Sequence, residues 1–232
     1  MGKITIAIDG FSSCGKSTMA KELSRCINYT FIDTGAMYRA VTLMALRNNI
    51  IAENGSIDLP KLEALLAKSD ITQRMNVNTG SVETLLNGEN VENEIRTMRV
   101  SSNVSAIAAV PFVRTELVCK QQMMGKNGGV VMDGRDIGTS VFPDAELKIF
   151  VTASTEVRAL RRFKELQTKG TEVPIDEVRK NLEERDYIDS HREVSPLRQA
   201  GDAVVIDNTN LSREEQLAML LALYRERQKR FD

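Results

Sequence analysis

The sequence predicts an α/β fold, a doubly wound parallel sheet with helices on both faces, from three observations. Short apolar runs rich in β-branched residues alternate along the chain with longer stretches of helical periodicity. These runs are continuous and bounded by turns, which is typical of parallel strands that are covered on both faces. A glycine-rich loop follows the first run and precedes a helix, which is the expected context of a phosphate-binding loop.

The expected elements follow this plan in order. Strands are expected at residues 3–9, 29–32, 130–132, 147–151 and 203–206. Helices are expected at residues 16–27, 35–49 and 212–229. Ser212 and Glu215 have the spacing of a capping box at the start of the last helix. At 232 residues the chain is expected to form a single large domain, residues 1–232, with a modest insert.

The insert is expected at residues 64–100, which leaves a core of residues 1–63 and 101–232. It contains strand-like runs at residues 71–77, 82–86 and 89–91. Asn87-Gly88 separates the last two runs, and Asn-Gly between such runs is the strongest short signal for a β-hairpin. A small antiparallel β insert is therefore expected within the parallel plan.

Composition limits the range of partners. A formal net charge of −1 provides no basic field for a nucleic-acid polymer. No run approaches the ~20 apolar residues of a membrane-spanning helix, and the N-terminus lacks the pattern of a signal peptide. Cys14, Cys26 and Cys119 have no Cys-x-x-Cys spacing, which indicates reduced thiols and a cytoplasmic location.

The loop after the first strand reads Gly10-Phe11-Ser12-Ser13-Cys14-Gly15-Lys16-Ser17-Thr18. This is the spacing of a phosphate-binding loop (P-loop), whose backbone N–H groups form an anion nest at a helix N-terminus. Lys16 is expected to reach the β- and γ-phosphates of a nucleotide, and Ser17 to bind Mg²⁺ through its hydroxyl. Because GTPases, ATPases and small-molecule kinases all carry such a loop, the loop alone does not select one of them.

Two further motifs place polar residues where they could bind a phosphate or a metal ion, one at the start of a helix and one directly after a buried strand. In the run from Asp33 to Arg39, Thr34 is expected to be a helix N-cap, and Arg39 could hold a phosphate bidentately or lie on the surface. In the run from Met132 to Thr139, Asp133 follows a buried strand and is placed to reach Mg²⁺ through water molecules. The next polar residues of that run are Arg135, placed to meet phosphate, and Asp136, a carboxylate with no metal role; a plain turn is the alternative.

Two groups of arginines have helical spacing. Arg158, Arg161 and Arg162 share one helix face, which favours either an anion or a solvated basic surface. The spacing of Arg185, Asp189 and Arg192 also indicates one face, which could be a substrate site or a row of surface salt bridges.

Together, Gly10–Thr18, Thr34–Arg39, Asp133–Thr139 and Arg185–Arg192 resemble the bacterial cytidylate kinases over nearly the whole chain. The stretch Asp-Gly-Arg-Asp-Ile-Gly-Thr is the most specific part of the resemblance. Adenylate kinases have Phe-Pro-Arg after the Asp-Gly and lack the antiparallel insert. The chain departs from the family at Phe11–Cys14, where Pro and Ala are more frequent, but the backbone of this loop does the binding, so little effect is expected.

The resemblance implies transfer of the γ-phosphoryl group of ATP to CMP and dCMP, with Mg²⁺. Nothing in the sequence suggests an obligate interface, so a monomer is expected. It implies that the insert belongs to the region that binds the nucleoside monophosphate, and that a helical lid spans about residues 154–172. The CMP site that it implies consists of Thr34, Arg39, Ser105, Arg114, Arg135, Asp136, Arg185, Asp189 and Arg192. The catalytic residues that it implies are Lys16, Arg135, Arg158 and Arg162, and the metal ligands are Ser17 and Asp133. Taken by themselves, Ser105 and Arg114 look like surface residues on either side of Pro111.

Elementary chemistry agrees with this assignment and leaves alternatives open. Asp136 could accept a hydrogen bond from the amino group of cytosine but would face a lone pair of uracil. No general base is needed, because the second pKa of the acceptor phosphate is ~6. A GTPase would need a guanine-binding Asn/Thr-Lys-x-Asp motif, which the sequence lacks. Kinases for UMP, AMP or shikimate, and a non-catalytic nucleotide-binding module, remain as alternatives.

Overall fold

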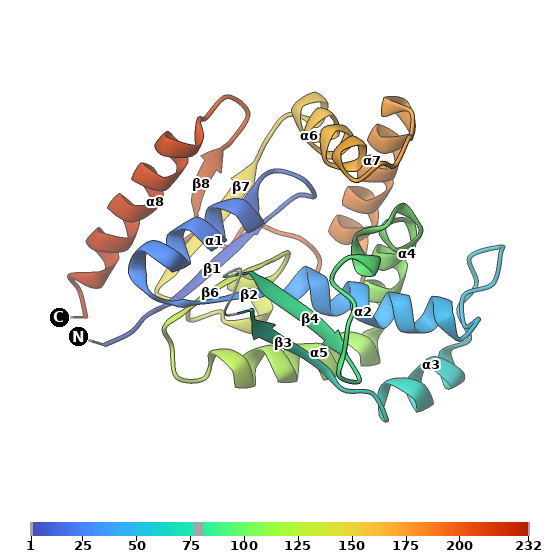
Figure 1. Ribbon diagram of the computed structural model, residues 1–232. Coiled ribbons are helices and arrows are strands. Elements are labelled where there is room, and N and C mark those ends of the chain that lie inside the picture. The colour runs from blue at the N-terminus through green and yellow to red at the C-terminus, as the bar shows by residue number, and fades with distance from the viewer. Residues whose placement is uncertain (1, 77–80, 232) are drawn as a thin grey trace. The chain divides into compact units, whose positions relative to one another are not determined.

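The computed structural model describes residues 2–76 and 81–231 (Figure 1). The chain separates into two compact units: the first contains Met1–Phe31 and Gln122–Asp232, and the second contains Ile32–Gln121. The chain enters the second unit within strand β2 (Thr30–Asp33) and returns within helix α5 (Pro111–Gly125). The second unit includes the expected insert, residues 64–100, together with the helices that precede and follow it.

The first unit is built on a parallel sheet with the strand order β2-β6-β1-β7-β8 (Figure 1). Besides β2, the sheet contains β1 (Thr5–Gly10), β6 (Val130–Gly134), β7 (Leu147–Thr152) and β8 (Val204–Asp207). β1 pairs in parallel with β6 and β7, and every residue of β1 and β6 is buried. The continuous apolar runs therefore form central parallel strands, as the sequence predicts.

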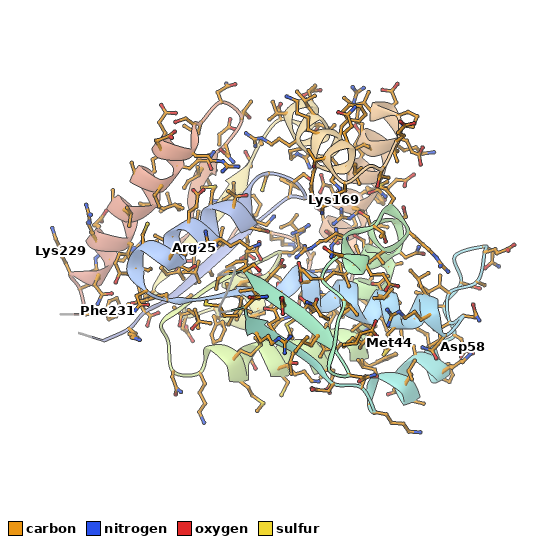
Figure 2. All side chains as sticks on the ribbon, viewed as in Figure 1. Arg25, Met44, Asp58, Lys169, Lys229 and Phe231 are labelled. Atoms are coloured by element: carbon orange, nitrogen blue, oxygen red, sulfur yellow. The ribbon has the colours of Figure 1, made fainter. Side chains whose placement is uncertain are left out.

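The helices of the first unit are α1 (Lys16–Ile27), α6 (Thr155–Thr168), α7 (Ile175–His191) and α8 (Arg213–Gln228), with a π-helical turn, η2, at Ile137–Val141. α1 and α8 pack side by side (Figure 1). The predicted capping box starts α8: the Ser212 hydroxyl accepts the Glu215 N–H, and the Glu215 carboxylate accepts the Ser212 N–H. Lys229 and Phe231 lie just beyond the end of α8 (Figure 2).

The second unit contains α2 (Thr34–Arg47), α3 (Leu59–Leu66), the 3₁₀ turn η1 (Glu94–Arg96), α4 (Met98–Ala109) and most of α5. Its antiparallel sheet is formed by β3 (Ile71–Met75), β4 (Val82–Leu86) and β5 (Glu89–Asn90), in that order. Asn87 and Gly88 have φ angles of 51° and 83°, so the predicted hairpin turn is confirmed. The end of the expected strand 71–77 falls partly outside the described residues.

The apolar core of the second unit lies between its helices and this sheet. α2 supplies most of one side, including Met37, Leu43 and Met44, which is labelled in Figure 2. Leu62 of α3 and Ile107 of α4 are fully buried against the same cluster. The insert is thus anchored by its own apolar face, which gives a three-stranded sheet independent stability.

The expected N-cap of α2 is corrected by one residue. Asp33, not Thr34, caps the helix, because its carboxylate accepts the Ala36 N–H at 2.9 Å and Thr34 is already the first helical residue. Asp33 is held in turn by Arg96, whose guanidinium lies 2.7 Å from its other carboxylate oxygen. A carboxylate at this position is also stabilised by the positive end of the helix.

Across residues 2–76 and 81–231, no helix has the length and apolar character needed to cross a bilayer.

Candidate active site

The P-loop has the backbone conformation of an anion nest. Gly15, the N-cap of α1, has φ 99°, and Ser13 has φ 59°, so left-handed residues alternate with others and turn successive N–H groups inward. A Cβ atom at Gly10 would lie 2.0 Å from the carbonyl oxygen of Val151. One at Gly15 would lie 2.4 Å from the amide nitrogen of Asn208, so glycine is required at both positions.

Lys16 lies inside this loop and is buried. Its ammonium donates to the carbonyl oxygen of Phe11 at 2.6 Å. Burial, and next the positive charge of Arg135, lower the pKa of Lys16. Because both causes disfavour the charged form of the lysine, an anion bound in the nest would stabilise it.

The two expected metal ligands, Ser17 and Asp133, lie together. The Ser17 hydroxyl donates to Oδ2 of Asp133 at 2.5 Å, because the end of β6 lies beside the start of α1. Among the described residues, no group of three or more His, Cys, Asp or Glu side chains could hold a metal by itself. Mg²⁺ is usually held by one or two carboxylates together with substrate phosphates, so a hydroxyl and a carboxylate fit it.

Arg135 connects the end of β6 to the P-loop and to α7. Its Nη2 donates to the Ser12 hydroxyl at 2.8 Å, and its Nε donates to Oδ2 of Asp189 at 3.1 Å. Burial alone would lower the pKa of Arg135, but the carboxylates of Asp189 and Asp186 outweigh it and raise the pKa. The arginine therefore stays charged within reach of the anion nest.

Asp186 of α7 also lies beside the P-loop, and the sequence analysis did not select it. Its Oδ1 accepts the backbone N–H of Ser12 at 3.3 Å, and its Oδ2 forms an ion pair with Arg158 of α6. Arg158 also donates to the carbonyl oxygen of Ser12, and its guanidinium lies 5.4 Å from the Phe11 ring. Asp186 precedes Asp189 by three residues, and this helical spacing was the available signal.

The arginines of α6 do not form a solvated basic face. Arg158 and Arg162 are each only 6% exposed, so that alternative is wrong for both. Arg162 pairs with Glu165 at 2.8 Å, whereas Arg161 donates to the carbonyl oxygen of Asn208 at 2.8 Å. Three arginines that share one face thus reach different partners, because each side chain is long enough to diverge from its neighbours.

Arg185, Asp189 and Arg192 are buried at the end of α7, so their interpretation as a surface salt-bridge row is wrong. Arg192, the residue after the last turn, lies 3.8 Å from Asp189 and donates to Oδ1 of Asp136 at 3.3 Å. Burial, and next the charge of Arg135, lower the pKa of Arg185 to about 10. Arg135 and Arg162 lower the pKa of Arg185 and the carboxylates of Asp189 and Asp186 raise it, so burial is the main cause of the shift, and a bound anion would favour the charged form.

Two more polar residues, Asp9 and Asn208, lie at strand ends and bind the backbone near Asp136 and the P-loop. Each carboxylate oxygen of Asp9 accepts one backbone N–H at 2.8 Å, from Ile137 and Gly138. The side-chain amide of Asn208 donates to the carbonyl oxygen of Cys14 in the P-loop at 2.7 Å. Both follow or end parallel strands, so the rule that selects Asp133 could have selected them as well.

Two of the expected acceptor-site residues lie on α2 in the second unit. Thr34 is buried at the start of the helix. One turn later, the guanidinium of Arg39 donates to the carbonyl oxygen of Ile95 in η1 at 3.1 Å. Arg39 is therefore tied to the segment that follows the antiparallel sheet.

Ser105 and Arg114 are buried in the second unit, so their interpretation as surface residues is wrong. The chain turns at Pro111, the first residue of α5, and this turn directs the following helix back onto the core. The Arg114 guanidinium donates to the carbonyl oxygen of Ala108 at 3.2 Å and lies 5.4 Å from the Tyr38 ring. No local pattern signals this burial, because it depends on contacts of Arg114 with other elements of the unit.

Comparison with known proteins adds an independent finding. Residues 6–226 match the protein family described as Cytidylate kinase. The cytidylate kinase of Bacteroides thetaiotaomicron is 62% identical over 217 residues, which cover 93% of this chain and 94% of that protein. Those of Phocaeicola vulgatus and Parabacteroides distasonis are 59% and 58% identical, over 93% and 97% of this chain and 94% and 97% of theirs.

Proposed function

The chain belongs to the cytidylate kinase family, and on that basis we propose that it transfers the γ-phosphoryl group of ATP to CMP, giving CDP and ADP. The structural observation that best supports this proposal is the meeting of Lys16, Arg135 and Arg158 at one P-loop. Such a concentration of buried cations suits a transferring phosphoryl group, whose charge is spread over its oxygens. A kinase for UMP is not favoured, since every relative described above is a cytidylate kinase.

The catalytic roles follow from charge and position. The N–H groups of residues 10–18 and the Lys16 ammonium hold the β- and γ-phosphates of ATP. Arg135 and Arg158, with Arg162, neutralise the charge of the phosphoryl group during transfer. The attacking phosphate oxygen of the acceptor is already largely ionised near neutral pH, because its second pKa is ~6, so no side chain has to remove a proton.

Mg²⁺ would be held by Ser17 and Asp133, whose oxygen atoms fit it. When bound with ATP, it supplies positive charge to the phosphates. The chain's own contribution is to keep these two oxygens together at the start of α1.

The acceptor nucleotide is recognised by two groups of residues. In the first unit, Asp136 accepts a hydrogen bond from the amino group of cytosine, and Arg185 and Asp189 bind the ribose side. Arg192 donates to Asp136 and contacts the base edge or the sugar. In the second unit, Thr34 and Arg39 bind the acceptor phosphate side, while Ser105 and Arg114 contact the base. dCMP is accepted as well as CMP.

Several further features belong to the proposal. Residues 154–172 act as a lid over the phosphates, and residues 64–100 belong to the region that binds the acceptor. The enzyme acts as a monomer in the cytoplasm, where its three cysteines stay reduced; Cys26 and Cys119 are exposed and Cys14 is buried, all as free thiols.

A direct assay tests the function. Purified protein with ATP and Mg²⁺ is offered CMP, dCMP, UMP, AMP and shikimate in turn, and the formation of ADP and of the phosphorylated acceptor is measured. We expect the highest kcat/KM with CMP or dCMP. Faster transfer to another acceptor would reassign the substrate, and saturable ATP binding without transfer to any acceptor would indicate a binding module.

A further inference from the structure

We propose that Asp9 is a positioning residue for recognition of the acceptor base. It fixes the peptide segment directly after Asp136 and thereby sets where the Asp136 carboxylate lies. This inference rests on the proposed function, in which Asp136 binds the amino group of cytosine. Asp9 itself touches neither nucleotide in this proposal.

The contact between Asp9 and this segment is specific. Asp9 lies next to the end of β1 and is 5% exposed. Its Oδ1 accepts the N–H of Ile137 and its Oδ2 accepts the N–H of Gly138, both at 2.8 Å. A carboxylate is the side chain that can accept two neighbouring backbone N–H groups at once, since an amide would present a donor to one of them.

The two N–H groups begin the π-helical turn η2, and Asp136 is the residue just before it. The carbonyl oxygen of Asp136 accepts the N–H groups of Ser140 and Val141 at 2.8 and 3.2 Å. Its side chain is contacted by Arg192. π-helical turns are rare and are frequently found at functional sites. Asp9 thus holds, from the strand that leads into the P-loop, the turn that orients Asp136.

Stability alone does not explain a carboxylate at this position. Burial raises the pKa of Asp9 to about 6, although two backbone hydrogen bonds act in the opposite direction. For an acid with a raised pKa, the charged form destabilises the fold as pH rises through the interval between the unfolded and folded values. The ionised Asp9 therefore opposes stability at neutral pH, which agrees with a role in function.

Few charges surround this carboxylate. Asp136 raises the pKa of Asp9 and Lys16 of α1 lowers it, after the larger effects of burial and of the two backbone N–H groups. The Lys148 stem, on β7, packs close to Gly138, but its ammonium pairs with Asp202. On β6, Asp133 pairs in register with Ile8 and not with Asp9.

The test is the ratio of kcat/KM for CMP to that for UMP, measured for wild type and Asp9→Asn. Both substrates carry the same phosphate, so its titration cancels in this ratio. We expect Asp9→Asn to lower the ratio about tenfold, because a displaced Asp136 loses the contact that distinguishes the two bases. Asp58→Asn is the matched control, since Asp58 accepts a backbone N–H at the start of α3, and it should keep the wild-type ratio (Figure 2).

The wild-type enzyme provides a second test that needs no variant. We expect its ratio to fall about threefold between about pH 7.5 and about pH 5.5, as Asp9 is protonated through its pKa of about 6. Asp9→Asn should show a low ratio at both pH values. Should Asp9→Asn fail to fold, this pH comparison decides the question.

Three outcomes would overturn the proposal. A folded Asp9→Asn enzyme with the wild-type ratio, or a wild-type ratio that does not change with pH, would show that Asp9 does not position Asp136. An unchanged ratio in Asp136→Ala would remove the proposed base contact itself. The last result is distinguishable from the first two, because it leaves no contact for Asp9 to position.

Discussion

Asp186 accepts a hydrogen bond from the backbone N–H of Ser12 at 3.3 Å, although 174 positions separate the two residues in the chain. The same carboxylate pairs with Arg158 of α6. A carboxylate of the protein therefore binds an N–H group of the P-loop and an arginine of the proposed lid. These are the two kinds of group that a nucleotide phosphate would use.

The first prediction concerns this carboxylate. Asp186→Asn removes a negative charge beside the P-loop and frees Arg158 from its ion pair. We expect ATP to bind about fivefold more tightly, which corresponds to about 1 kcal/mol, the net value of one hydrogen bond. Equilibrium titration with ATP measures this change. Asp176→Asn, at an exposed position of α7, should not change the affinity; weaker ATP binding by Asp186→Asn would instead mean that Asp186 holds Arg158 in its active position.

The second prediction concerns Lys16. Lys16→Ala removes the buried ammonium at the P-loop, and we expect kcat to fall by about 10²–10³-fold because charge stabilisation in the transition state is lost. CMP binding should change much less. Steady-state kinetics with each substrate varied in turn separates the two effects. Lys229→Ala, at the exposed end of α8, is the control and should retain full activity (Figure 2).

The third prediction concerns Asp136. Asp136→Ala should reduce the preference for CMP over UMP by ~1–3 kcal/mol, the usual value of one specific base contact. The measurement is the ratio of kcat/KM values for the two acceptors at neutral pH. Asp144→Ala, an exposed change in the same unit, should leave the ratio intact. An unchanged ratio in Asp136→Ala would assign recognition of the base to other residues.

The fourth prediction concerns the second unit. Arg39→Ala should raise KM for CMP by at least about tenfold, since a charge-assisted hydrogen bond contributes ~1.5–3 kcal/mol, and should leave KM for ATP nearly unchanged. Arg74→Ala removes an arginine that is 62% exposed on β3 and should change neither constant. An increase in both KM values after Arg39→Ala would point to a general loss of structure, which a thermal unfolding curve would reveal.

Much of the fold could be predicted because its signals are local. Continuous apolar runs mark β1 and β6, Asn87-Gly88 marks the hairpin, and Ser212 with Glu215 marks the start of α8. Each signal lies within a few residues of the element that it predicts. The P-loop belongs to the same class, because its glycines and lysine are contiguous in the chain.

Local pattern was less informative where burial depends on packing between elements. Ser105 and Arg114 look like surface residues in the sequence but are buried, because Pro111 turns α5 back onto the core. Thr34 looks like an N-cap in the sequence, but Asp33, one residue earlier, caps the helix. A short-range pattern cannot distinguish such choices, since neighbouring positions offer similar chemistry.

The sequence by itself determined the parallel α/β plan, the P-loop and the membership in the cytidylate kinase family. Sequence rules could have drawn attention to Asp9, at a strand end, and to Asp186, three residues before Asp189. Only the tertiary structure identified their partners, which are backbone N–H groups 128 or more positions away. A hydrogen bond to the backbone leaves no mark on the identity of the partner residue. Such contacts become visible only when the chain has folded.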